Sequence, residues 1–163
     1  MGRFVLLWVM MMMMMMMMMP AAPVWAFNFD QYQPGDLDAV WNDARFEGED
    51  SEGLVIFQPQ KLRLEARLNR QAYPCPTGVM KTALTMLGLP PEALTEMPIS
   101  RCLEVSAPSG RPVVLYIQDV LAEPLSREIP SGGRIILFCD YIFRSSRGPG
   151  LLLNEFQALP AQP

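Results

Sequence analysis

Histidine is absent from this chain of 163 residues. Catalytic triads and dyads built on serine or cysteine use an imidazole as their general base, so their usual forms are excluded. Histidine-ligated zinc is excluded for the same reason. The three cysteines include no CxxC pair and are too few for a four-cysteine zinc site. We therefore expect no metal site and no cofactor.

Basic residues are also few, with 13 Lys and Arg against 17 Asp and Glu. One of them, Arg3, precedes a long apolar segment that we expect to be removed. The remaining chain then has 12 basic and 17 acidic residues and a net charge of −5. The phosphates of nucleic acids and anionic lipids repel an acidic domain, so we expect neither as a partner.

The N-terminus has the three parts of a secretory signal. Arg3 supplies the positive charge, and Phe4 to Met19 are sixteen uncharged residues, the last ten of them methionine. Pro20 and Pro23 end this segment, and Val24-Trp25-Ala26 provides small residues at a cleavage site. This pattern predicts export of the chain.

The predicted signal peptide covers residues 1–26, and the predicted location is the periplasm if the source is bacterial, and otherwise outside the cell. We expect no stable membrane span after cleavage. An uncleaved anchor is the open alternative, although the apolar segment is shorter than the roughly 20 residues that cross a bilayer. Residues 27–53 are predicted to be a polar N-terminal segment, and residues 54–163 a single β-rich globular domain.

Alternation and turn signals predict a mostly antiparallel sheet in this domain. Between Lys61 and Arg70, apolar residues alternate with polar ones, which is typical of a strand with one solvated face. Glycine and proline clusters separate the other apolar runs. These runs predict strands at residues 54–57, 101–107, 113–121, 134–144 and 150–158.

One longer helix is predicted to pack on the sheet. Thr77 is its candidate N-cap, and Gly88 is placed to end it. Its expected apolar stripe consists of Val79, Met80, Ala83, Leu84 and Leu87. Shorter helical segments are expected at 37–41, capped by Asp36, and at 91–97. The predicted fold class is α+β: a small, mostly antiparallel β-barrel or sandwich of OB-like or SH3-like size with one packed α-helix.

Two of the three cysteines are expected to be bridged in an oxidising compartment. Cys75 lies between two prolines in a rigid loop, and Cys102 opens a predicted strand. Cys139 lies among apolar residues in the middle of another strand, which is typical of a small buried side chain. The sequence therefore predicts a Cys75–Cys102 disulfide with Cys139 buried and free.

The most unusual local segment is 144–150, where two arginines and two serines surround a turn that contains glycine and proline. Guanidinium, hydroxyl and backbone amide groups can together hold a carboxylate or a phosphate. The same composition is also typical of an ordinary hairpin turn. The candidate binding residues are Arg144, Ser145, Ser146, Arg147, Gly148 and Gly150.

Two hypotheses for function follow. The first is an exported, non-catalytic binding or assembly module whose partner is another exported or envelope protein or an anionic ligand. The second is a small cell-envelope hydrolase that uses a pair of carboxylates, as glycosidases do. The candidate carboxylates are Asp119, Asp140 and Glu155. Two carboxylates that converge in a cleft would favour the hydrolase, and an exposed apolar or arginine-lined groove would favour the binding module.

Overall fold

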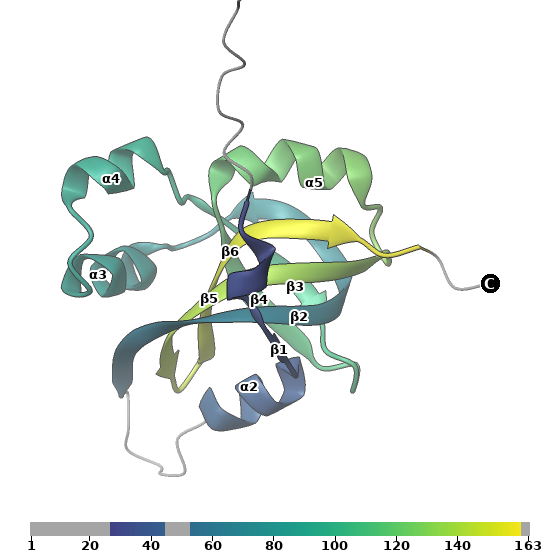
Figure 1. The fold of residues 1–163 in the computed structure, drawn as a ribbon, viewed down its shortest axis with the longest axis horizontal. Helices are drawn as coiled ribbons and strands as arrows, with labels where there is room; N and C mark the ends of the chain where they lie inside the picture. Colours follow the sequence, from purple (N-terminus) through teal and green to yellow (C-terminus); the bar gives the residue numbers. More distant parts are fainter. Residues whose placement is uncertain (1–26, 45–52, 161–163) are drawn as a thin grey trace, which may run out of the picture.

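The computed structural model describes residues 27–44 and 53–160. Six strands in these residues form one mixed sheet, so the fold is α+β and rich in β-structure, as predicted (Figure 1). The strands are β1 (Gln33–Gly35), β2 (Leu54–Pro74), β3 (Arg101–Ser106), β4 (Pro112–Ile117), β5 (Arg134–Ser145) and β6 (Gly148–Ala158). The predicted signal peptide, residues 1–26, and residues 45–52 of the polar segment lie outside the described residues.

The strands are hydrogen-bonded in the order β1-β2-β3-β4-β6-β5, and β2 also pairs with β5. The pairings therefore return from β5 to β2. The ladders of β2 with β3, β2 with β5, β3 with β4 and β5 with β6 are antiparallel. The short β1–β2 and β4–β6 ladders are parallel.

β2 is a single strand of 21 residues, where the sequence had predicted separate strands at 54–57 and 61–70. The proline expected to separate them, Pro59, lies where the β2–β5 register shifts between Ile56 and Gln60. A shift of this kind tolerates a residue without an amide hydrogen, so the strand continues through it. The predicted alternation is confirmed further along β2, where Leu64, Ala66 and Leu68 are buried and Arg63, Glu65 and Arg67 are exposed.

The strand predicted at 113–121 was too long. β4 ends at Ile117 and is followed by the 3-10 turn η3 (Asp119–Leu121) and helix α5 (Ala122–Glu128). Asp119 accepts hydrogen bonds from the backbone N–H of Ser100 at 2.9 Å and from its hydroxyl at 2.6 Å. These bonds hold Asp119 at the start of the helical turn, so it does not lie within an apolar strand as expected.

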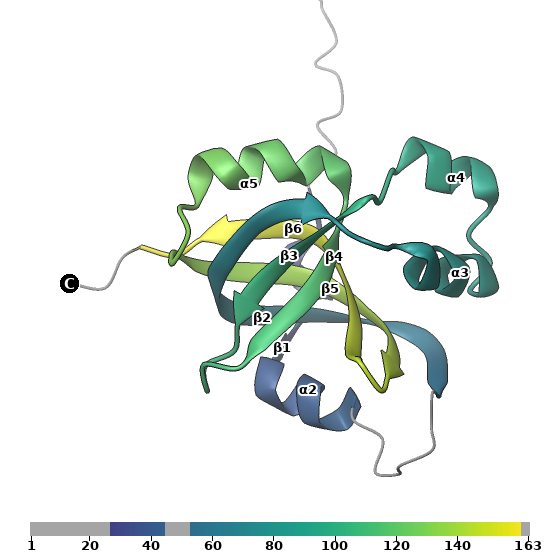
Figure 2. The same ribbon diagram turned by 180° about the vertical axis from the view of Figure 1, so that it is seen from behind.

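The described residues contain four α-helices, of which three correspond to the predicted longer helix and to the shorter helical segments at 37–41 and 91–97, whereas α5 was not predicted. Helices α2 and α5 lie at opposite ends of the sheet, and α3 and α4 lie to one side of it (Figures 1 and 2). Leu37 and Val40 of α2 and Leu125 of α5 are buried in the main apolar core between the strands. The four helices are α2 (Leu37–Ala44), α3 (Gly78–Met86), α4 (Pro91–Glu96) and α5.

Helix α3 begins and ends close to the predicted bounds but packs with fewer side chains than expected. Met80, Ala83 and Leu84 are buried in a second core cluster with Phe143 of β5. Val79 was expected in the same stripe but is exposed. The rotation of α3 therefore leaves one apolar side chain at its N-terminal end facing outwards.

The N-terminal residues from Phe27 onwards pack against the outer side of β5. The ring centroids of Phe29 and Tyr32 lie 4.8 and 5.5 Å from that of Phe138, and Phe27 stacks on Tyr32 at 5.3 Å. Asp36 Oδ1 accepts a hydrogen bond from the N–H of Asp38 at 2.9 Å, as expected of a capping residue before α2. This segment thus covers Phe138 on the outer side of β5, and α2 follows it in the chain at one end of the sheet.

Candidate functional site

The predicted binding residues lie at the hairpin turn between β5 and β6. The Ser145 hydroxyl donates to the carbonyl of Gly148 at 3.1 Å and accepts from the N–H of Arg147 at 3.3 Å. Ser145 therefore shapes the turn with both of its hydrogen-bonding functions. Ser146 and Arg147 are exposed at its tip.

The two glycines of the candidate site are required by packing. Gly148 has a φ of +118°, and a Cβ there would lie 2.7 Å from the ring of Trp41. A Cβ on Gly150 would lie 2.4 Å from the ring of Phe143. Because real Cβ atoms do not approach so closely, both positions need glycine to bring an aromatic ring against the hairpin. The hairpin consequently packs against Trp41 of α2, and Phe143 of β5 packs against Gly150 of β6.

The two arginines of the candidate site lie in different surroundings. The Arg144 guanidinium is 3.5 Å from Asp43 Oδ1 of α2, and the Tyr141 hydroxyl donates to the other oxygen of Asp43 at 3.1 Å. Burial and the neighbouring Asp43 raise the pKa of Tyr141, so this phenol remains a hydrogen-bond donor. Arg144 therefore ties the hairpin to α2, whereas Arg147 extends from the turn into a groove.

This groove, which we call the Arg147 groove, has two lobes of about 400 and 310 Å³. Both volumes lie within the range of sites that hold small ligands or short peptide segments. The lobes share Tyr116, Phe143, Ser145 and Arg147. The larger lobe adds Tyr73, Pro74, Cys75, Pro76, Cys102, Val114, Gly148 and Pro149, and the smaller adds Gly53, Leu54, Val79 and Ser146.

The larger lobe of the Arg147 groove is mainly apolar and aromatic, the smaller lobe is more polar, and both share one positive charge. Among the described residues, Arg147 is the only charged side chain that lines either lobe, although the chain as a whole is acidic. The guanidinium of Arg70 lies 4.0 Å above the ring of Tyr73 at the edge of the larger lobe. An anion that enters the groove therefore meets a cation, and none of the carboxylates in residues 27–44 and 53–160 lines the same walls.

The disulfide forms part of one wall. Cys75 and Cys102 are bonded, with 5.7 Å between their Cα atoms, which confirms the predicted pair. Cys139 is buried and free, also as predicted. The bond fixes the Pro74–Pro76 segment against β3, so this wall is held in place covalently. A disulfide is typical of proteins that fold in an oxidising compartment.

The candidate carboxylates do not meet in the Arg147 groove. Asp119 is held by Ser100 at the start of η3. Asp140 and Glu155 both lie near Tyr32: burial raises the pKa of this tyrosine, and the negative charges of the two carboxylates raise it further. Neither Asp140 nor Glu155 lines a lobe of the groove. The three acids are thus divided between two places in the fold.

Tyr73, Val114 and Tyr116 were not identified from the sequence. Val114 and Tyr116 are two residues apart on β4 and point to the same outer side, while Val113, Leu115 and Ile117 are buried. The alternation was therefore present in the sequence, but no local signal indicated that the outer side faces a groove. Its other wall comes from the hairpin about 30 residues later in the chain.

No group of three or more His, Cys, Asp and Glu side chains in the described parts of the chain is placed to hold a metal ion. None of the helices in residues 27–44 and 53–160 is long and apolar enough to cross a membrane.

The titration of Tyr116 is expected to report the proximity of Arg147. Burial raises the pKa of Tyr116, and the positive charge of Arg147 opposes this by stabilising the phenolate. The Arg147→Ala variant should therefore titrate Tyr116 at a higher pH than the wild type does. NMR of ring-labelled tyrosine, within the pH range where the circular dichroism stays native, measures this. A Tyr116 pKa that is unchanged or lower in the variant would contradict the arrangement.

Comparison with protein-family models, with curated proteins and with solved structures finds no match to this chain.

Proposed function

We propose that this chain is an exported, non-catalytic binding module that holds an acidic segment of another exported or envelope protein in the Arg147 groove. The observation that supports this function best is the charge pattern. A chain with 17 acidic residues has a groove in which Arg147 is the one charged lining residue among those described. An acidic partner is attracted to that position and repelled by most of the remaining surface.

Two walls of the groove are held in place, which favours binding because little conformational entropy is lost when a ligand enters. One wall is fixed by the Cys75–Cys102 bond. The other is the β5–β6 hairpin, which packs against Trp41 through Gly148 and is tied to α2 by the Arg144–Asp43 ion pair. A turn held between two long strands is a suitable platform for a contact residue at its tip.

The proposal includes a finer description of the fold. We infer that the ring of pairings β2-β3-β4-β6-β5-β2 is a small barrel of the OB type, the kind expected from the strand pattern. In such barrels the second and third strands and the loops after the first and fourth strands bind ligands. The first strand of this barrel is β2, so the second and third are β3 and β4, and the two loops are residues 75–100 and the turn at 146–147. These elements surround the Arg147 groove. This is an analogy of architecture and supports the location only.

Export is the remaining component of the proposal. It is supported by the signal-like residues 1–26 and by the disulfide, since cytosolic proteins rarely keep such bonds. Cleavage after Ala26 would leave Phe27 as the N-terminal residue and the domain free of a membrane span. The proposed binding needs neither a cofactor nor a metal. The carboxylate hydrolase has less support, because Asp119 lies apart from the other two acids and neither Asp140 nor Glu155 lines the Arg147 groove.

A defined peptide probe tests the proposed function. Short synthetic peptides in which valine and glutamate take turns at every second position, with serine between them, should bind the exported protein more tightly than the same peptides with glutamine in place of glutamate. Arg147→Ala should weaken binding of the glutamate peptide by about tenfold, which corresponds to about 1.4 kcal/mol for one charge pair in a partly enclosed site. Added salt should weaken the wild-type interaction. Fluorescence anisotropy of labelled peptides gives the dissociation constants.

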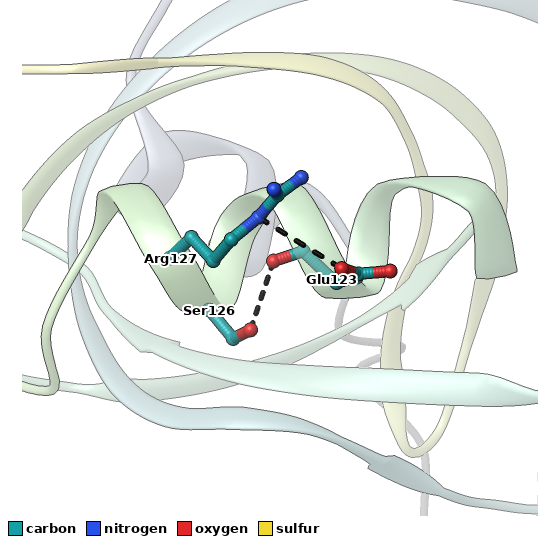
Figure 3. A network of polar contacts seen from close by, with 3 residues as sticks. All are labelled: Glu123, Ser126 and Arg127. Carbon is teal, nitrogen blue, oxygen red and sulfur yellow. Dashed lines mark hydrogen bonds and ion pairs between the residues drawn. The ribbon is translucent and has the colours of Figure 1, made fainter.

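Arg127 provides the matched control, because it is an exposed arginine of α5 that does not line the groove. Its Nε lies 4.0 Å from Glu123 Oε1, and the hydroxyl of Ser126 donates to the Glu123 carbonyl at 2.8 Å (Figure 3). Arg127→Ala changes the net charge as Arg147→Ala does and should leave binding unchanged. Equal binding of glutamate and glutamine peptides, or equal losses in the two variants, would refute the proposed function.

A further inference from the structure

The two strands beside the Arg147 groove diverge. β4 and β6 are paired at Tyr116–Leu152 and Ile117–Leu153, and within the described part of the chain their ladder contains no other pair. Towards its start, β4 runs from Pro112 to Leu115 without β6 beside it. The larger lobe of the groove is lined by Val114 and Tyr116 on one side and by Gly148 and Pro149 on the other. The groove thus lies where the two strands separate.

The hydrogen-bonding pattern shows which backbone groups face this gap. The N–H of Ala107 donates to the carbonyl of Arg111 at 2.9 Å, so these residues form a hydrogen-bonded pair at the end of the β3–β4 ladder. Such pairs alternate with non-hydrogen-bonded pairs along an antiparallel ladder. The pair Glu104–Val114 is therefore of the second kind. The N–H and C=O of Val114 point away from β3, towards the gap.

We propose that this free edge of β4 accepts an extended, acidic segment of another exported protein as an added strand. The inference depends on the proposed function and specifies how the partner is held. Strand addition supplies backbone hydrogen bonds at Val114, and the side chains select the sequence. The edge is short and begins with Pro112, so it suits a short segment more than an open-ended sheet.

The side chains around the edge define the chemistry of that segment. Val114 is 44% exposed and lies on the same side of β4 as Tyr116. Alternate side chains of an added strand point to the same side. An apolar side chain of the partner can therefore lie beside Val114, while an acidic side chain elsewhere on the segment reaches Arg147. Because Val114 and Arg147 line the same lobe, the apolar and the acidic residue of the partner are expected two or four positions apart, on the same side of the segment.

Hydrogen exchange of individual amides tests the added strand. With the valine–glutamate peptide at saturation, exchange of the Val114 amide should slow by about tenfold or more, because it becomes a donor to the peptide. The amides of Val113 and Leu115 already face β3 and serve as internal references. Unchanged exchange at Val114 while the peptide is bound would overturn the added strand and leave the proposed function standing. Failure of the peptide to bind would overturn both.

Methylated peptides separate backbone pairing from simple coverage of the groove. Two peptides, one N-methylated on its valine and glutamate amides and the other on its serine amides, have the same side chains but lack donors on opposite edges. One of them should lose binding by about tenfold and the other should keep it. Equal affinities would overturn strand addition. Protection of Val114 that grows with protein concentration in the absence of peptide would instead assign this edge to a second copy of the chain.

Discussion

Removal of the Cys75–Cys102 disulfide is expected to lower the free energy of unfolding by about 2–4 kcal/mol. The bonded residues are 27 positions apart, so the bond restricts a long loop in the unfolded chain. That loop contains α3 and α4, and Met80 and Leu84 of α3 form part of the second core cluster. Without the bond, this cluster must be assembled from a segment that is free to move in the unfolded state.

The double variant Cys75→Ala/Cys102→Ala avoids leaving one reactive thiol, and urea denaturation followed by circular dichroism measures the change. A reducing agent should destabilise the wild type by a similar amount and leave the double variant unaffected. Cys139→Ala is the control, since this buried cysteine is not bonded and should lose only the small packing contribution of one sulfur atom. A loss below about 1 kcal/mol in the double variant would show that the loop is already restricted by other contacts.

Phe138→Ala is expected to cost more, about 3–5 kcal/mol. The side chain is 2% exposed, although it points to the outer side of β5, because the N-terminal segment covers it. Phe27 and Tyr32 contact its ring edge-on at centroid distances of 6.0 and 5.5 Å. Truncation would leave a cavity and also remove the surface on which these residues pack. The loss should therefore include part of the N-terminal packing.

Phe29→Ala removes a ring of the same size from the same cluster and is the matched comparison. Phe29 is 39% exposed and lies 4.8 Å from the Phe138 ring, so its truncation leaves less of a cavity. Its cost should be clearly smaller than that of Phe138→Ala, as measured by chemical denaturation of both variants. The double variant should cost less than the sum of the two, because the rings share a contact. Equal costs would indicate that the N-terminal segment does not cover Phe138 in solution.

Local sequence patterns predicted the elements in which buried residues recur at one regular spacing. The alternation from Lys61 to Arg70 identified both sides of β2, and the position of Cys139 among apolar neighbours identified it as buried. Helix α5 was missed because Ala122–Glu128 has few apolar residues and contains Pro124, and because the preceding Val120 and Leu121 extended an apolar run. The strand ends where Asp119 accepts a hydrogen bond from the Ser100 hydroxyl. These residues are 19 positions apart, so no local pattern reveals the contact.

The candidate site shows the same limit. The sequence placed Arg144 and Arg147 together, but the fold gives them different neighbours, because Asp43 comes from a helix about 100 residues earlier in the chain. Val79 was expected in the core from its position in a helical stripe, whereas it lines the smaller lobe of the groove. Its surroundings depend on how the loop closed by the disulfide rotates α3, and the spacing of apolar residues does not determine that rotation.

The long β2 strand has a consequence for how the chain folds. Its pairs with β5 join residues between 67 positions apart, for Arg67–Arg134, and 91 apart, for Leu54–Ser145. Closing loops of this size is entropically costly, and topologies of high contact order fold in milliseconds to seconds. The β3–β4 hairpin can form early from local contacts, whereas the β2–β5 ladder must wait for β5 to be synthesised. Ribosome-bound chains that end before Arg134 should therefore remain largely unfolded.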